Sequence, residues 1–240
     1  MPDFLPIGEN RLLKRLRDDD RSVVLQHLKS FNMVQGAVLH RPMQEVDYVY
    51  FPLSGMISLL AVMKTGDQIE TAIVGREGVV GGSIGSFNSL SFGQATVQLP
   101  GTALRMAAEP FQELFHASPR FRAAINEFQS VIFLQAQQSA ACHALHTVEQ
   151  RLCRWILQSE DVVGSTEIRL TQEFLSHMLG VHRPAVSLAA TALQTRGLIQ
   201  YTRGKITILN RGALEKKSCE CYAVVQGHMN RMGVERSKLR

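Results

Sequence analysis

The sequence predicts an α+β fold in three parts: an N-terminal double-sheet β-roll, a long helix and a C-terminal winged helix-turn-helix. Three observations support it. Short β-type runs separated by glycine-rich turns occupy the first half of the chain. A long helical pattern that is nearly free of glycine and proline follows. The last part reads as helix, glycine turn, helix and basic hairpin. We expect domains at residues 1–118, 119–146 and 147–240.

The first half combines a short helical start with many short strands. The start covers about residues 9–30, and residues 108–117 read as a second short helix. Between them, short strands with glycine-rich corners predict a β-barrel or a double-sheet jelly roll. The predicted strands are residues 48–51, 55–62, 68–74, 94–99 and 102–106.

The long helical pattern runs from residue 119 to about residue 159, with a break expected at residues 144–147. Apolar residues at a spacing of three to four form one stripe on it. Such a stripe can pair with its own copy in a dimer or pack onto the roll of its own chain. The predicted dimer interface comprises Phe121, Ile125, Phe128, Ile132, Gln135 and Ser139.

The segment at residues 170–209 carries the strongest signal. Thr171 can cap a first helix, and Gly180 can take the left-handed conformation that ends it. A second helix begins near His182, where Pro184 is tolerated in the first turn. Residues 198–201 and 206–209 then form two strands joined by a basic hairpin.

One face of the second helix suits the major groove of duplex DNA. Arg183, Ser187, Thr191 and Gln194 share its outer face, and Arg183 can donate two hydrogen bonds to guanine. A two-helix hairpin also occurs in ordinary bundles, but the basic wing favours DNA. The predicted DNA contacts, phosphate-binding residues included, are Thr171, Gln172, His182, Arg183, Ser187, Leu188, Thr191, Arg203 and Lys205.

The charge distribution agrees with this division. Residues 146–240 hold 14 lysines and arginines against 8 acidic residues, a net charge of +6. Residues 1–145 carry a net charge of −1, and the whole chain carries +5. This asymmetry is typical of a nucleic-acid-binding module joined to a neutral one.

Composition excludes several classes of protein. The chain has 240 residues, of which 45% are hydrophobic, and no apolar run is long enough to span a membrane. The N-terminus lacks the features of a secretory signal, so we expect a cytoplasmic protein. The four cysteines, Cys142, Cys153, Cys219 and Cys221, are too few for a disulfide framework. Cys219-x-Cys221 lacks zinc-site spacing. His143-x-x-His146 is the one histidine pair with a tight metal spacing and shares a helix face, but such pairs are more often solvated or hydrogen-bonded, so we expect incidental groups and no metal.

The order of roll, long helix and winged helix-turn-helix resembles the Crp/Fnr family of bacterial transcription regulators over about residues 10–212. The most specific match is TQEFLSHMLGVHRPAV at residues 171–186, where Arg183 aligns with the family's base-reading arginine. The resemblance implies a cyclic-nucleotide-binding-like roll and a homodimer on an inverted-repeat operator. It also implies contact with RNA polymerase.

Departures from the family pattern concern the effector. Cyclic-AMP-binding members carry a glutamate in a Gly-Glu-Leu corner and a later Arg-Ser pair. Gly82 stands at the glutamate position here, and residues 92–96 contain no arginine. We therefore expect that the roll does not bind cyclic AMP in the way these members do, and the identity of the effector stays open. A different ligand, an anion included, could use a pocket formed by Gly81, Gly82, Ser83, Gln94 and Ala95.

Other departures concern metal sensing and the operator. No cysteine precedes Cys142, which argues against an N-terminal iron–sulfur cluster, while haem ligation by a histidine stays open. Pro184 and Leu188 replace a glutamate and an arginine of other members, so the half-site should differ. Leu188 either touches a thymine methyl group or packs inward.

These patterns predict a homodimeric, sequence-specific DNA-binding transcription regulator with a roll of unknown effector. Alternatives are a ligand-independent DNA-binding regulator and a cupin-like metal enzyme. The enzyme would need a His-x-His pair, which does not occur, so we predict no catalytic residues. Residues 212–240 predict an added helix on the DNA-binding domain, with a basic end at Arg236, Lys238 and Arg240. Its inward positions are Leu214, Cys221, Val224, Val225 and Met229.

Overall fold

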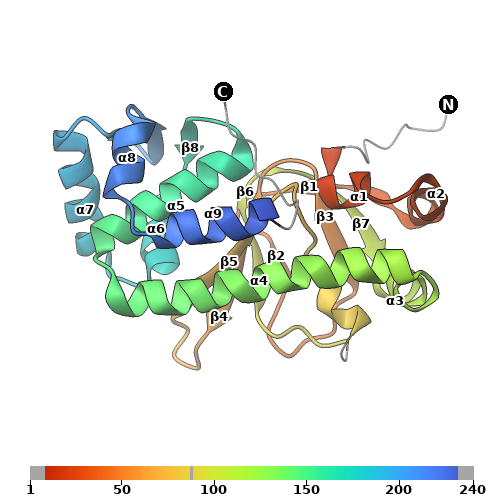
Figure 1. The fold of residues 1–240 in the computed structure, drawn as a ribbon. Coiled ribbons are helices and arrows are strands. Elements are labelled where there is room, and N and C mark those ends of the chain that lie inside the picture. Colours follow the sequence, from red (N-terminus) through yellow and green to blue (C-terminus); the bar gives the residue numbers. More distant parts are fainter. Residues whose placement is uncertain (1–8, 87–88, 232–240) are drawn as a thin grey trace.

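The computed structural model describes residues 9–86 and 89–231. Its N-terminal part is a double-sheet roll of antiparallel strands, with strand orders β1-β7-β3 and β2-β6-β4-β5 (Figure 1). Side chains from both sheets fill one hydrophobic core. The strands are β1 (Lys29–Met33), β2 (Val38–His40), β3 (Tyr48–Pro52), β4 (Met56–Val62), β5 (Gln68–Val74), β6 (Gln94–Leu99) and β7 (Gly101–Ala107).

All five predicted strands are present, and those at residues 68–74 and 94–99 have the predicted bounds. β1 and β2 escaped prediction because β1 is mostly exposed and polar and β2 has three residues. The predicted helical start is two helices, α1 (Arg11–Lys14) and α2 (Asp18–His27), and its last residue, Ser30, belongs to β1.

The long helix α4 (Pro119–Leu145) follows α3 (Ala108–Ala117) and lies along the roll (Figure 1). Phe121, Ile125 and Phe128 are fully buried in the roll core of their own chain. Gln135 is also buried, and its amide bonds the backbone N–H and C=O of Ile73 in β5, each at 3.3 Å.

The predicted dimer interface is therefore wrong in its residues. Ser139 is buried with the others, and Ile132 is half-buried against the roll core. An apolar stripe with this spacing can pack against a second copy of the helix or against a sheet, and in this structure it packs against the sheet of its own roll. The opposite face of α4 is exposed and carries four alanines, one phenylalanine and three uncharged polar residues: Ala123, Asn126, Ser130, Phe133, Gln137, Ala140, Ala141 and Ala144.

The chain breaks after α4 and continues as a winged helix-turn-helix with a three-stranded sheet of order β8-β10-β9. The break lies in the predicted interval, and a capping box of Thr147 and Gln150 starts the next helix. The elements are α5 (Val148–Val163), β8 (Glu167–Arg169), α6 (Gln172–Leu179), α7 (Arg183–Thr195), β9 (Ile199–Thr202) and β10 (Lys205–Ile208).

The winged domain packs directly against the roll. Met56 and Ile73 of the roll share a hydrophobic core with Trp155 and Leu179 of the winged domain. The Trp155 indole N–H donates a 2.9 Å hydrogen bond to the carboxylate of Glu70 in β5, and both side chains are buried. A buried contact of this kind fixes how the two parts meet.

The C-terminal segment differs from its prediction. It forms two helices, α8 (Arg211–Lys217) and α9 (Cys221–Arg231), and α9 lies along α4 (Figure 1). Val225 and Met229 reach the roll core, so the segment packs beyond the DNA-binding domain. The predicted basic end lies outside the described residues. Among the helices described, none has both the length and the apolar character needed to cross a membrane.

Candidate nucleic-acid interface and roll cavity

The turn between α6 and α7 forms as the sequence predicts. The Thr171 hydroxyl accepts the N–H of Phe174 at 3.3 Å and caps α6. Gly180 ends that helix with φ 59°, in the left-handed region. A Cβ atom at Gly180 would lie 2.8 Å from the side chain of Ile69 in β5, so glycine also allows the winged domain to approach the roll.

α7 turns its apolar residues inward and its polar residues outward. Val186 and Leu193 are fully buried, and Ala189 and Ala190 are nearly so. His182 is the N-cap residue of α7, and Pro184 occupies the first turn, where no helical hydrogen bond is lost. The predicted orientation of this helix is therefore confirmed.

The outward face of α7 leaves its side chains open to a ligand. His182, Arg183 and Thr191 are exposed, and Ser187 is half-exposed. Leu188 is 74% exposed, so it does not pack inward. An apolar side chain on this face suits contact with a thymine methyl group.

Two α6 residues hold the start of this face. The Arg183 guanidinium lies 2.8 Å from the Glu173 carboxylate, and both side chains are well exposed. The Ser187 hydroxyl donates to the Gln172 amide oxygen at 3.0 Å. In an exposed pair the guanidinium is free to exchange its partner for a base, because such pairs contribute about 0–1 kcal/mol.

The hairpin after α7 is a tight wing. Arg203 and Gly204 occupy its two-residue turn with φ of 49° and 75°, as in a type I′ turn. Arg203 is exposed and forms no ion pair within the described residues, whereas the Lys205 ammonium lies 2.9 Å from the Glu167 carboxylate. Of the two predicted wing cations, Arg203 is the freer. The amide oxygen of Gln194 accepts the N–H of Tyr201 and so fixes the wing to α7.

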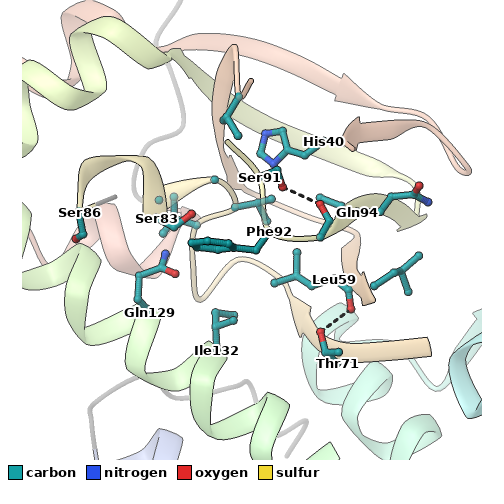
Figure 2. Close-up of a pocket in the computed structure, with 18 of the residues that line it drawn as sticks. His40, Leu59, Thr71, Ser83, Ser86, Ser91, Phe92, Gln94, Gln129 and Ile132 are labelled. Atoms are coloured by element: carbon teal, nitrogen blue, oxygen red, sulfur yellow. Dashed lines mark hydrogen bonds between the residues drawn. The ribbon is translucent and has the colours of Figure 1, made fainter. Parts of the chain in front are cut away.

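A cavity of about 600 Å³ lies between the roll and α4. All five predicted pocket residues line it: Gly81, Gly82, Ser83, Gln94 and Ala95. Figure 2 shows the exposed Phe92 ring lying across this space, with Ser83 and Gln129 on one side and Leu59 on the other.

The described lining of this cavity contains no arginine, lysine, aspartate or glutamate. Its polar side chains are neutral, among them Ser91, Asn126 and Gln129. His40 is its one titratable group, and burial lowers the pKa of His40 because the cation would lose its hydration. The neutral ring donates its Nε2–H to the Tyr48 carbonyl at 2.8 Å. A cyclic phosphodiester would meet no cation here.

The structure also brings together four groups that the sequence interpretation kept apart. The ligand atoms of Cys142, His146, Cys219 and Cys221 all lie within 4.8 Å of one another. His143 turns away from this cluster, since its Nδ1 lies 2.8 Å from the Arg151 guanidinium. The two pairs are more than 70 residues apart, so spacing alone gave no signal for the cluster.

Comparisons with known proteins agree with this architecture. Residues 150–217 match the family described as the Crp-like helix-turn-helix domain. This part of the chain is therefore a Crp-like helix-turn-helix domain, and the chain as a whole has the fold of Crp/Fnr-type regulators. No curated protein matches the sequence significantly.

Solved structures of transcription regulators share this fold over most of the chain. A protein assigned to the Crp/Fnr family of transcriptional regulators, from Eubacterium rectale, has a TM-score of 0.69 at 19% identity, covering 88% of this chain and 98% of its own. The c-di-GMP-responsive regulator CLP of Xanthomonas campestris has a TM-score of 0.67 at 18% identity, covering 80% of this chain and 99% of its own. FixK2 of Bradyrhizobium japonicum has a TM-score of 0.67 at 14% identity, covering 80% of this chain and 98% of its own.

Proposed function

We propose that the protein is a homodimeric, sequence-specific DNA-binding regulator that acts in the cytoplasm and contacts RNA polymerase. The outward face of α7 carries the proposal. Arg183 stands at the start of that helix, where the N-terminal residues of a recognition helix meet base edges. Its exposed guanidinium can bind guanine O6 and N7, and Leu188 can contact a thymine methyl group.

Two groups beside α7 suit the DNA backbone. Thr171 and Gln172 are exposed at the N-terminus of α6, where backbone N–H groups and the helix dipole favour phosphate. Arg203 stands at the tip of the wing. These contacts would set the position of the protein on the duplex, while α7 would read the sequence.

The exposed face of α4 is our proposed dimer interface, in place of the buried stripe. Phe133 is 64% exposed on it, with Ala140 and Ala144 on the same side. Small side chains allow two helices to approach closely, and a large exposed aromatic ring favours burial against a second copy. Two copies would present two α7 helices to an inverted repeat.

The roll cavity is the proposed effector site. Its neutral lining suits an uncharged, largely apolar molecule with a few hydrogen-bonding groups. Asn126 and Ser130 of α4 border the cavity and belong also to the exposed α4 face. A bound molecule would therefore lie next to the proposed dimer interface, which gives it a route to influence DNA binding. A ligand-independent regulator is the second candidate.

The test joins oligomeric state to DNA binding. Light scattering should give twice the chain mass of 26.7 kDa. A double variant, Phe133→Glu with Ala140→Glu, should be monomeric because two charges would be buried at the interface. It should also lose most of its affinity for a selected inverted-repeat duplex. Met63→Glu, on an exposed roll residue, is the matched control and should leave both properties unchanged.

A monomeric wild type, or a double variant that stays dimeric, would refute the proposed interface. Wild-type binding should also weaken steeply with salt, because phosphate contacts release counterions. Absence of any duplex binding at low salt would refute the DNA-binding function itself.

A further inference from the structure

Three thiols and one imidazole meet where α4 ends. Cys142 lies in the last turn of α4 and His146 is the C-cap residue of that helix, while Cys219 precedes α9 and Cys221 is its first residue. Cys142 and Cys221 are fully buried, and Cys219 is nearly so. No other group of three or more potential ligands within the described residues comes together in this way.

The distances within this cluster match a single tetrahedral ion. Zinc–sulfur bonds of about 2.3 Å and zinc–nitrogen bonds of about 2.05 Å place tetrahedral ligands about 3.8 Å (S–S) and 3.6 Å (S–N) apart. The sulfurs of Cys142 and Cys219 are 3.5 Å apart, and Cys221 Sγ lies 3.5 Å from His146 Nδ1. Small rotations of these side chains would complete the tetrahedron.

Outer contacts also orient these ligands. The Nε2 atom of His146 lies 3.2 Å from the Glu220 carboxylate, which leaves Nδ1 facing the thiols. A carboxylate behind a histidine ligand is a common support in zinc sites. Gln138 donates its amide N–H to Cys221 Sγ at 3.1 Å, as expected for an acceptor that carries negative charge.

Two buried arginines lie beside the cluster, and their positive charge favours a negative charge nearby. Arg151 and Arg154 are each less than 10% exposed, and neither pairs with a carboxylate within the described residues. The Arg154 guanidinium reaches Ser139, one turn before Cys142, and Arg151 contacts His143, the next residue after Cys142. The Nε atoms of both arginines lack a hydrogen-bond partner. Buried cations are costly without compensation, and three thiolates around one Zn²⁺ ion carry a net charge of −1 that would offset part of the arginines' charge.

We propose that Cys142, His146, Cys219 and Cys221 bind one Zn²⁺ ion in a closed, structural Cys3His site. Soft thiolates with one imidazole select zinc, and four protein ligands leave no position open for catalysis. The ion would join the end of α4 to the α8–α9 junction. Residues 147–218, which contain α5 to α8, lie between the two ligand pairs. The ion would therefore close the winged domain into one loop and hold it against α4.

Metal analysis of the purified full chain under reducing conditions tests this site. We expect about one zinc per chain, and cobalt substitution should give the visible absorption of a tetrahedral thiolate site. Cys221→Ala should weaken zinc affinity, in competition with a chromophoric chelator, by more than the 10–100-fold typical of a lost outer partner. Glu220→Gln should weaken it by about that 10–100-fold, and its exposed position keeps the fold intact.

Cys153→Ala is the matched control, because this buried thiol lies in the winged-domain core outside the cluster. It should retain one zinc per chain. Less than half an equivalent of zinc in the wild type, or unchanged affinity in Cys221→Ala, would overturn the proposal. So would equal losses in Cys221→Ala and Cys153→Ala, or an iron–sulfur chromophore in place of zinc. None of these readouts depends on DNA binding.

Discussion

The outward face of α7 and the roll cavity solve different recognition problems. The first is exposed and holds Arg183, which pairs with Glu173 at the surface, beside Arg203 on the neighbouring wing, which forms no ion pair within the described residues. The second lies between a sheet and α4, and its described lining holds no permanently charged side chain. The first suits a polyanion, where charge gives affinity and base-edge hydrogen bonds give specificity. The second suits an uncharged molecule that is held by shape and apolar contact.

The largest effect should come from Arg183, the residue that we propose reads bases. Arg183→Ala should weaken binding to the preferred duplex by about 1–3 kcal/mol, roughly 5–150-fold, because a bidentate contact with guanine is lost. Binding to unrelated duplex should change little. Competition binding with the two duplexes measures the difference. Equal losses on both would mean that Arg183 contacts the backbone and does not read sequence.

A matched pair of dyes tests the other half of the comparison. N-phenyl-1-naphthylamine is uncharged, and 8-anilinonaphthalene-1-sulfonate is its sulfonated counterpart. The neutral dye should bind about tenfold more tightly, because a buried sulfonate without a cation loses hydration. Ser83→Phe should abolish this preference by filling the cavity. Tighter binding of the sulfonate, or a rise in melting temperature with cyclic AMP, would contradict a neutral cavity.

A smaller effect should distinguish the wing from α7. Arg203→Ala should weaken binding by a similar factor for every duplex and reduce the slope of log K against log salt by about 1. Lys205→Ala is the matched comparison, since Lys205 already pairs with Glu167, and its slope should change less. Salt titrations of both variants decide this. A sequence-dependent loss in Arg203→Ala would place the wing among the base readers.

The smallest effect concerns pH and the cavity histidine. Burial lowers the pKa of His40, so the unfolded chain binds a proton near pH 6.5 that the folded chain does not bind. The free energy of unfolding should therefore fall as pH drops below about 6.5. His40→Gln should remove part of this dependence, as measured by urea unfolding at several pH values. The same pH dependence in His40→Gln as in the wild type would contradict a buried, neutral His40.

The sequence predicted the α7 surface well because its information is local. Caps, turn glycines and helical spacing lie within residues 171–205, and each local rule places a side chain by itself. Thr171, Gly180 and Leu193 all take their predicted places. The five strands and the position of the helix break were predictable for the same reason.

Features that depend on distant partners were harder to predict. The apolar stripe of α4 has the spacing of a dimer seam, but only the sheet beneath Phe128 and Gln135 shows what covers it. The spacing of Cys142 and Cys219 in the sequence gave no reason to place them together; their sulfurs meet because α9 folds back along α4. The spacing of apolar residues shows which face of a helix is buried, but it does not show which element covers that face.

The most direct measurement of the central claim is selection of bound duplexes from a randomised pool by wild type and by Arg183→Ala. We expect the wild type to select an inverted repeat whose half-sites lie about one helical turn, or a multiple of it, apart. The variant should select the same repeat with one guanine position relaxed in each half. No enriched motif, or identical motifs from both proteins, would contradict the assignment of α7 as the reading helix.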